Sequence, residues 1–172
     1  MSAIVFIRDE GARLKLDEAV VGVFFSHAQR DPNAMEAGGV LMGRHIRGTR
    51  DVVVDSVTTP MRGDRRSRFS FHRSQRPHQR ALNGAWESSQ GTCVYLGEWH
   101  THPEPYPTPS SIDLADWRKR LRHDVVDSES LFFVIVGQEL CAAWEGFRST
   151  REISRLEQSA CRPRRVSVIS AK

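Results

Sequence analysis

The spacing of apolar residues along the 172-residue chain predicts three helices. Apolar side chains recur every three or four residues from Leu16 to Arg30, and Asp31–Pro32 then ends that helix. The same spacing runs from Gln75 to Ser89. A third helix is predicted from Ser110 to His123, because serine is a favoured residue at the start of a helix.

Runs of β-branched and aromatic residues between these helices predict strands. Gly38–Gly43 and Val52–Val54 flank a polar turn and favour a β-hairpin, and Thr92–Trp99 is a further β-prone run. Leu131–Val136 is continuously apolar, which is typical of a buried central strand, and Cys141–Phe147 is its expected partner. The expected fold class is α/β of the mixed α+β kind, with a central mixed β-sheet flanked by helices.

Length and composition predict one domain over residues 1–160, followed by a basic tail, 161–172, that we expect to be poorly ordered. No stretch approaches the roughly 18 apolar residues of a membrane span, and the amino terminus lacks the pattern of a secretory signal. Cys93, Cys141 and Cys161 lie far apart, which favours a reducing cytoplasm. We expect Cys93 and Cys141, in predicted strands, to be small buried hydrophobic residues.

The net charge of +4 is unevenly distributed, since seven arginines lie between Arg62 and Arg80. Within this segment we expect a basic loop with a short strand at Arg68–Phe71. Arginines alternate there with Phe69 and Phe71, and such residues can contact phosphates and stack on bases, so a nucleic-acid-binding domain is one alternative. A solvated face, or a docking surface for an acidic protein, explains the same residues.

The clearest chemical signal is His100 and His102 at the end of a predicted strand. Residues two apart in a strand face the same side, so both imidazoles would point to one place. Prolines stiffen the following segment, 103–109, and the first turn of the next helix would return Asp113 to the histidines. Two histidines and a carboxylate would leave the fourth position of a tetrahedral zinc open, as in catalytic zinc sites.

Hydrolysis at such a site also needs a proton acceptor and a hydroxyl that stabilises an oxyanion, for which Glu36 and Ser110 are the candidates. Each residue has a plainer interpretation. A His-x-His pair at a strand end is often a surface feature. Ser110 and Asp113 have the spacing of a helix capping box, and Glu36 fits an ordinary solvated loop.

The string GEWHTHPEPYPTPSSIDLADW resembles the motif of the JAMM (MPN+) metalloproteases, in which His-x-His-Pro is followed by Ser and Asp. Residues 36–43, EAGGVLMG, resemble the glutamate and Gly-rich strand of that family. The resemblance implies an MPN/JAB cytidine-deaminase-like sandwich and one zinc per chain. It also implies that His100, His102 and Asp113 bind the metal, that Glu36 is the acid and base, and that Ser110 stabilises the oxyanion.

Within that family, the Gly-Glu-Trp-His-Thr-His-Pro-Glu form resembles the bacterial Jab-type proteins found beside E1- and E2-like enzymes, including those of CBASS anti-phage operons. The implied activity is that of a deubiquitinase-like isopeptidase, which hydrolyses the amide bond after the carboxyl terminus of a conjugated cGAS-like nucleotidyltransferase. A zinc hydrolase that processes a ubiquitin-like sulfur carrier is an alternative, as is a metal-free scaffold. Trp99 and Trp117 flank the motif and either line a groove or, as we expect for Trp117, belong to the core.

Overall fold

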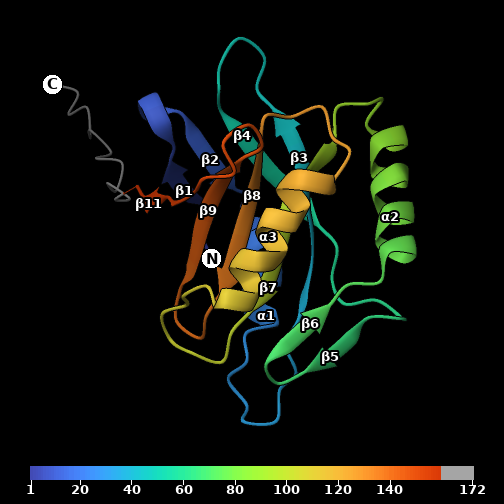
Figure 1. Cartoon of the computed structure of the whole chain (residues 1–172), viewed down its shortest axis with the longest axis vertical. Coiled ribbons are helices and arrows are strands. Elements are labelled where there is room, and N and C mark those ends of the chain that lie inside the picture. Colours follow the sequence, from blue (N-terminus) through green and yellow to red (C-terminus); the bar gives the residue numbers. More distant parts are fainter. Residues whose placement is uncertain (160–172) are drawn as a thin grey trace, which may run out of the picture.

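The computed structural model describes residues 1–159 as one large curved sheet with helices on both faces (Figure 1). The expectations for the tail 161–172 and for Cys161 lie outside these residues. The elements are β1 (Ile4–Ile7), a 3₁₀ turn η1 (Asp9–Gly11), β2 (Arg13–Leu16), α1 (Glu18–Ser26), β3 (Gly38–His45), β4 (Val52–Val57), β5 (Arg65–Ser67), β6 (Ser70–His72), α2 (Gln75–Ser88), β7 (Val94–Thr101), α3 (Ser111–His123), β8 (Ser130–Val136), β9 (Cys141–Phe147), β10 (Ile153–Arg155) and β11 (Glu157–Gln158).

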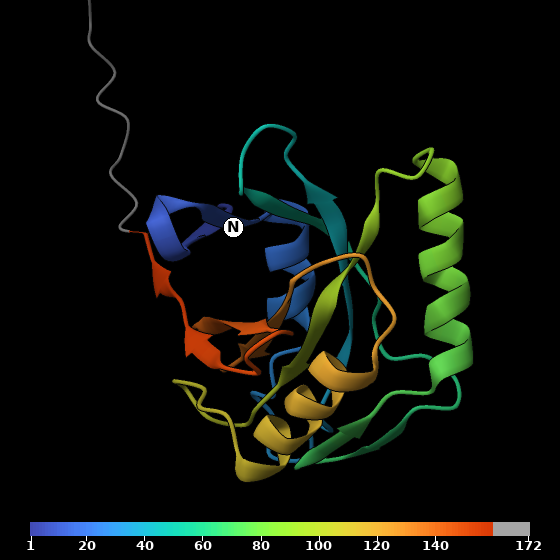
Figure 2. The ribbon, with the colours of Figure 1, turned by 45° about the horizontal axis from the view of Figure 1, so that its top comes forward.

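The sheet is mixed, in the order β10-β9-β8-β7-β3-β4-β2-β1-β11. The pairs β7–β8 and β2–β4 are parallel, whereas the others are antiparallel. Residues 153–158 pair with β9 through β10 and with β1 through β11, so the sheet curls until its two ends share one segment (Figure 2). The expected mixed sheet flanked by helices is confirmed.

Strand β8 lies at the centre of the core, and all seven of its residues are buried. Its side chains alternate between two apolar clusters, one built with α1 and the other with α3. Trp117 of α3 stacks on Phe133 with ring centroids 4.7 Å apart, and Trp99 of β7 packs 4.8 Å from Phe24 of α1. Burial of an aromatic side chain of this size contributes about 2–3 kcal/mol. Trp117 is therefore a core residue as expected, and Trp99 is one too.

Other predicted elements differ in their limits. The first helix was expected to run from Leu16 to Arg30, but α1 ends at Ser26. The residues after Ser26 leave the helix, and the side chain of Gln29 takes part in a buried hydrogen-bond network. Only part of the strand expected at Arg68–Phe71 forms, since Ser70 and Phe71 belong to β6 whereas Arg68 and Phe69 are the turn of the β5–β6 hairpin. Strands β1 and β2 were not predicted. No helix among residues 1–159 is long and apolar enough to cross a membrane.

Strand β7 carries a bulge that determines which of its side chains reach the core. The register with β3 shifts between Leu41 and Met42, opposite Gly97, whose φ is +145°. Leu96 and Trp99 consequently both join the α1 cluster although they are three residues apart. A Cβ at Gly97 would lie 1.8 Å from the Phe132 carbonyl oxygen, so only glycine fits.

The bulge generates a test of the fold. We expect Gly97→Ala to lower the free energy of unfolding by about 2–4 kcal/mol, because the added Cβ must displace β8 and the left-handed backbone is strained. Gly84→Ala in α2 is the matched control, since its Cβ would meet no atom within 4 Å and helix propensity favours alanine by about 1 kcal/mol. Urea unfolding of both variants measures the difference, and equal stability of the two would contradict the assignment of the bulge.

Candidate metal centre and active site

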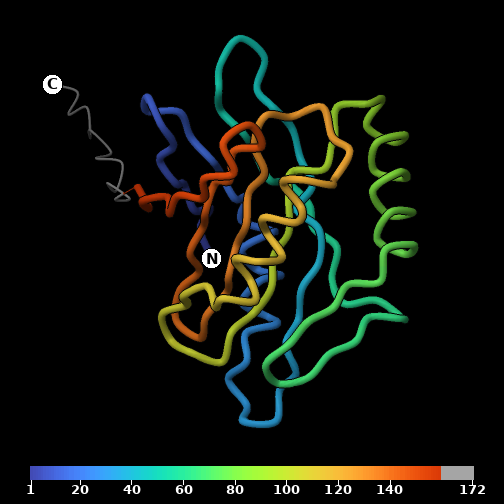
Figure 3. Tube along the Cα trace, viewed as in Figure 1, coloured from blue at the N-terminus to red at the C-terminus, as the bar shows by residue number. Residues whose placement is uncertain are grey.

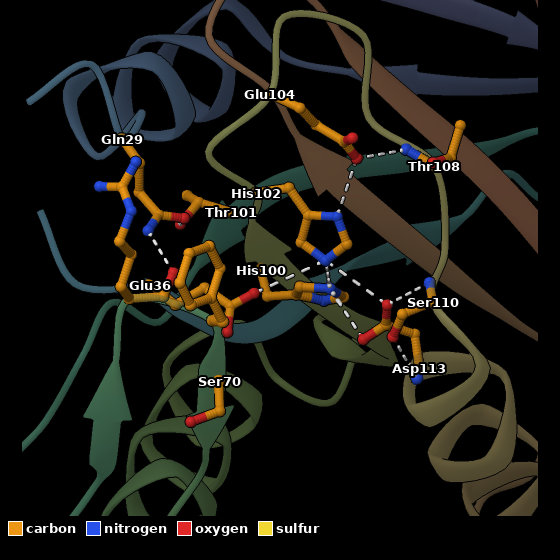
Figure 4. Close-up of polar contacts among 12 residues, drawn as sticks. Gln29, Glu36, Ser70, His100, Thr101, His102, Glu104, Thr108, Ser110 and Asp113 are labelled. Carbon is orange, nitrogen blue, oxygen red and sulfur yellow. Dashed lines mark hydrogen bonds and ion pairs between the residues drawn. The ribbon is translucent and has the colours of Figure 1, made fainter. Parts of the chain in front are cut away.

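The two histidines of the motif meet where β7 ends. Their Nε2 atoms lie 3.0 Å apart (Figure 4), on the face of the sheet that α3 covers. The backbone N–H of His102 donates to the Val136 carbonyl at 2.9 Å, which fixes the residue just beyond the strand. The expectation that His100 and His102 point to one place is confirmed, although β7 extends two residues beyond the predicted Thr92–Trp99.

Asp113 completes the cluster and also caps its helix. Its Oδ1 lies 3.2 Å from His100 Nε2, and its Oδ2 lies 3.4 Å from His102 Nε2. The same carboxylate accepts the Ser110 backbone N–H at 2.6 Å, while the Ser110 hydroxyl oxygen accepts the Asp113 N–H at 3.2 Å. The capping box is therefore present, and it does not prevent Asp113 from lying beside the histidines as expected, because a capping carboxylate still offers oxygens to a second group.

The loop that joins the histidines to this helix lies at one end of the sheet, beside the β8–β9 turn (Figure 3). It carries prolines throughout and contains neither helix nor strand, as its sequence predicts. The backbone N–H of Gln138 donates to the Glu104 carbonyl at 2.8 Å, and that of Glu139 donates to the Pro105 carbonyl at 3.3 Å. The β8–β9 turn thus holds the loop in place and, through it, the start of α3.

Glu36 approaches the cluster from the opposite side. Its side chain is almost fully buried, and Oε1 lies 3.6 Å from His102 Nε2. The β5–β6 hairpin holds its backbone, since the Glu36 N–H donates to the Ser67 carbonyl at 2.7 Å and Arg66 Nε donates to the Glu36 carbonyl at 2.6 Å. Glu36 is therefore not the solvated loop carboxylate that its local sequence equally allows.

A buried polar network beneath the site includes residues that the sequence did not mark as functional. The Thr101 hydroxyl accepts the Ala37 N–H and donates to Gln29 Oε1, both at 2.9 Å (Figure 4). Gln29 Nε2 donates to the carbonyls of Ala34 and Arg68. One glutamine thus ties the end of β7, the Glu36 loop and the hairpin together, and its only sequence signal is a polar residue at the end of a predicted helix.

A second network fastens the hairpin segment to the sheet. His78 of α2 lies 2.6 Å from the Thr58 hydroxyl through Nδ1 and 3.1 Å from Asp64 Oδ2 through Nε2. The Thr58 hydroxyl oxygen also accepts the Val40 N–H at 2.7 Å, and the side chains of His78 and Asp64 are fully buried. This Asp–His–Thr chain resembles a nucleophilic triad, but its burial and its backbone bonds make it structural.

The two carboxylates of the site have opposite electrostatics. Burial raises the pKa of Glu36 from 4.5 to about 7, against the opposing effect of His100 and His102. Burial also acts to raise the pKa of Asp113, but its hydrogen bonds with the two histidines outweigh burial and hold the pKa far below its usual value. Burial lowers the pKa of His102, yet the hydrogen bonds to Asp113 and Glu104 leave it raised. Divergent carboxylates of this kind are typical of acid–base sites.

The donor set fits a tetrahedral zinc. With bonds of about 2.0–2.1 Å, such an ion places its ligand atoms about 3.3 Å apart. The nitrogens of His100 and His102 and the oxygens of Asp113 lie 3.0–3.4 Å from one another across the cluster. Ligand atoms of Glu36, His100 and His102 also lie within 4.8 Å of one another. Since the Glu36 oxygen is farther from His102 than the Asp113 oxygen is, Asp113 better fits the third ligand position.

An open groove of about 410 Å³ leads to the cluster, with the β5–β6 hairpin on one side and α3 on the other. Two strongly exposed apolar side chains stand on its opposite walls, Phe69 at 74% exposure and Ile112 at 72%. Arg73 and Arg120 lie in the groove and approach Glu98 at 2.5 and 3.5 Å, so the groove floor contains compensated charges. The groove gives a ligand from solution access to the cluster.

The arginine-rich segment is partly structural. Arg66 and Arg68 donate to backbone carbonyls of residues 31–36, and Arg73 pairs with Glu98. Among the described residues, Arg62, Arg65, Arg76 and Arg80 are exposed and form no ion pair with a carboxylate. The solvated-face interpretation therefore accounts for part of the segment.

Neither described cysteine takes part in the site. Cys141 is buried in β9, as expected, and burial raises its pKa to about 12. Cys93 is only half-buried and precedes β7, so its expected place within a buried strand is wrong. Burial also raises the pKa of Cys93 above its ordinary value. Both thiols are therefore weak nucleophiles near neutral pH.

Residues 17–151 match the family described as prokaryotic homologs of the JAB domain. The chain belongs to this family. Among curated relatives of this JAB domain, a protein of Escherichia coli is 33% identical over 158 residues, which cover 92% of this chain and 96% of the relative. A protein of Vibrio cholerae serotype O1 is 42% identical over 120 residues, 70% of this chain and 73% of the relative. Both relatives are named CD-NTase/cGAS isopeptidase.

The fold of the JAB domain also resembles a solved structure. A protein of Desulfitobacterium hafniense aligns with a TM-score of 0.53 at 23% identity, covering 81% of this chain and 87% of that one. This likeness concerns the fold alone. The family match confirms the resemblance that the motif residues at 36–43 and 97–117 indicate.

The raised pKa of Glu36 makes stability of the metal-free JAB domain depend on pH. Between about pH 4.5 and 7 the folded state binds a proton at Glu36 that the unfolded state has released, so stability falls as pH rises through this range. We expect metal-free Glu36→Gln to exceed the native protein in free energy of unfolding by on the order of 2 kcal/mol at about pH 8, and to match it at about pH 4.5.

Urea unfolding at the two pH values measures this difference. Glu139→Gln removes the same charge from an exposed position and is the control. A Glu36→Gln variant no more stable than the native protein at about pH 8 would show that Glu36 is not held in a desolvated site.

Proposed function

We propose that this JAB domain is a zinc-dependent JAMM-type isopeptidase that hydrolyses the amide bond after the carboxyl terminus of a conjugated protein. The convergence of His100, His102 and Asp113 within 3.4 Å, with buried Glu36 beside them, carries the proposal. In this proposal the first three residues bind the metal. A zinc ion there would act as a Lewis acid and lower the pKa of a coordinated water.

Glu36 is assigned the proton transfer. Its buried carboxylate lies beside His102 without entering the closest set of donor atoms, and burial raises its metal-free pKa to about 7, which favours its taking up a proton. A positive charge bound next to it would lower that pKa, so that Glu36 begins the reaction ionised. It then accepts the proton of the attacking water and delivers it to the leaving nitrogen.

Ser110 is assigned the oxyanion. Its Oγ accepts the Asp113 N–H, so the hydroxyl hydrogen is left to donate outward, and the residue lines the groove next to the cluster (Figure 4). A donor placed there in advance stabilises the negative charge that develops on the carbonyl oxygen during attack. The capping hydrogen bonds fix Ser110 and Asp113 relative to each other, so the donor and the metal ligand keep one geometry.

The names of the curated relatives support the substrate part of the proposal. Both are isopeptidases whose names specify a CD-NTase or cGAS, and we assign to this chain a cGAS-like nucleotidyltransferase released from its conjugates. Attachment by an E1/E2-like ligase system in CBASS anti-phage defence, in the cytoplasm, belongs to the same proposal. The sulfur-carrier alternative uses the same site and differs only in the protein whose tail enters the groove.

The first test measures zinc and cleavage together. Native protein loaded with zinc should release a CD-NTase from a conjugate joined through the carboxyl terminus to a lysine side chain, and should contain about one zinc per chain by elemental analysis. Glu36→Gln should keep the zinc and lose cleavage by about 10²- to 10⁴-fold. The double variant His100→Ala, His102→Ala should lose both.

The outcomes separate the alternatives. Cleavage of a sulfur-carrier conjugate instead would favour the second substrate class with the same chemistry. A native protein that stays metal-free in the presence of zinc would favour the scaffold interpretation. Salt-dependent binding of nucleic acid by such a metal-free protein would favour a nucleic-acid-binding domain. Full activity of Glu36→Gln would overturn the proton-transfer role.

Ser110 has two functions that one substitution removes together. We expect Ser110→Ala to lower kcat by about 10²- to 10³-fold through loss of the oxyanion donor, and to lower stability by about 1 kcal/mol through loss of the cap. Ser111→Ala, which removes a neighbouring exposed hydroxyl outside the capping box, is the control. Kinetics and thermal melting of both variants are measured side by side. A loss of stability without loss of kcat would leave Ser110 as a cap alone.

A further inference from the structure

Glu104 contacts the side of His102 that faces away from the cluster. Its Oε1 lies 3.1 Å from His102 Nδ1 (Figure 4). Both ring nitrogens of His102 are therefore engaged, Nε2 toward His100 and Asp113 and Nδ1 toward Glu104. Among the described residues, no hydrogen bond engages Nδ1 of His100, so the two histidines differ.

Glu104 is itself held in place on two sides. Its Oε1 also accepts the Thr108 backbone N–H at 2.9 Å, and its carbonyl accepts the Gln138 N–H at 2.8 Å. A Cβ at Gly137 would come within 2.7 Å of that carbonyl, so the turn packs closely against it. The backbone and the carboxylate of Glu104 are therefore both held by hydrogen bonds, so the carboxylate can in turn fix the orientation of the His102 ring.

The chemistry of imidazole gives this contact a consequence. A neutral ring carries one hydrogen, and a carboxylate at Nδ1 can only accept, so it keeps the hydrogen on Nδ1 and leaves the lone pair on Nε2. The two Nε2 atoms are only 3.0 Å apart, so a hydrogen on His102 Nε2 would bond to His100 instead. A His102 ring that takes that tautomer, or that rotates, no longer presents an Nε2 lone pair at the metal position.

We propose that Glu104 is a positioning residue, which keeps His102 in the Nδ1–H tautomer and in the orientation that presents Nε2 to the metal. The inference rests on the proposed metal-binding function of the cluster. Glu104 acts only through His102 and touches neither the metal position nor the groove. Its effect therefore belongs to metal affinity and to the ring of His102.

The experiment measures zinc affinity by competition with a chelator. We expect Glu104→Ala to weaken zinc binding by about 10- to 100-fold, because partners of metal-binding histidines have effects of this size. Glu104→Gln should recover most of the affinity, since an amide oxygen also accepts from Nδ1–H. Glu139→Ala removes an exposed carboxylate near the same loop and should leave affinity unchanged.

A double-mutant cycle separates positioning of His102 from support of the loop through Thr108. Glu104→Ala should lower affinity further in a His100→Ala background, but not in a His102→Ala background, where its target ring is absent. An equal loss in both backgrounds would show that the carboxylate acts on the loop and overturn the proposal.

Nitrogen-15 NMR of the metal-free protein at alkaline pH provides a readout that needs neither zinc nor activity. His102 should be the Nδ1–H tautomer in the native protein and a mixture in Glu104→Ala. Native-like His102 signals in that variant would overturn the proposal. Absence of conjugate cleavage by zinc-loaded native protein would instead count against the isopeptidase assignment and leave these results standing.

Discussion

Thr101 holds the site together, although it faces away from it. It lies between the two histidines of β7, and its side chain points into the core, where its hydroxyl accepts the Ala37 N–H and donates to Gln29. The Thr101 backbone N–H donates to the Ala37 carbonyl at 2.8 Å, so the residue after Glu36 is bonded twice to the residue between the histidines. Because β7 alternates, fixing Thr101 inward fixes both imidazoles outward.

The bulge at Gly97 makes that arrangement compatible with the core. If β7 had no bulge and alternated regularly from the buried Leu96, Trp99 and Thr101 would face outward. Both histidines would then lie in the α1 cluster. Instead Trp99 packs against Phe24. The same local irregularity therefore supplies a core tryptophan on one face and a pair of donor nitrogens on the other, which links the stability of the sheet to the geometry of the cluster.

Much of the fold was predictable because its signals are local. The amphipathic spacing of α2, the serine cap of α3 and the continuous apolar run of β8 each lie within a few consecutive residues, and each element formed as expected. The motif string and residues 36–43 likewise contain all the residues proposed to act in the site. What was missed depends on contacts across the chain: α1 ends early because Gln29 bonds to Thr101, 72 residues away. Nothing near Gln29 in the sequence encodes that partner.

The contact of Glu104 with His102 likewise could not be predicted from the sequence, although the two residues are close in the chain. Glu104 lies two residues from His102 and is part of the motif string, yet its contact with Nδ1 depends on a loop path that the β8–β9 turn imposes from more than 30 residues away. Prolines restrict each residue of that loop but do not choose its direction. The β8–β9 turn determines the direction of the loop, because it donates hydrogen bonds to the carbonyls of Glu104 and Pro105. These bonds fix the position of the Glu104 carboxylate and of the start of α3. The orientation of His102 and the position of Asp113 are therefore consequences of one packing event, which explains how an irregular, proline-rich segment can carry a site that requires accurate geometry.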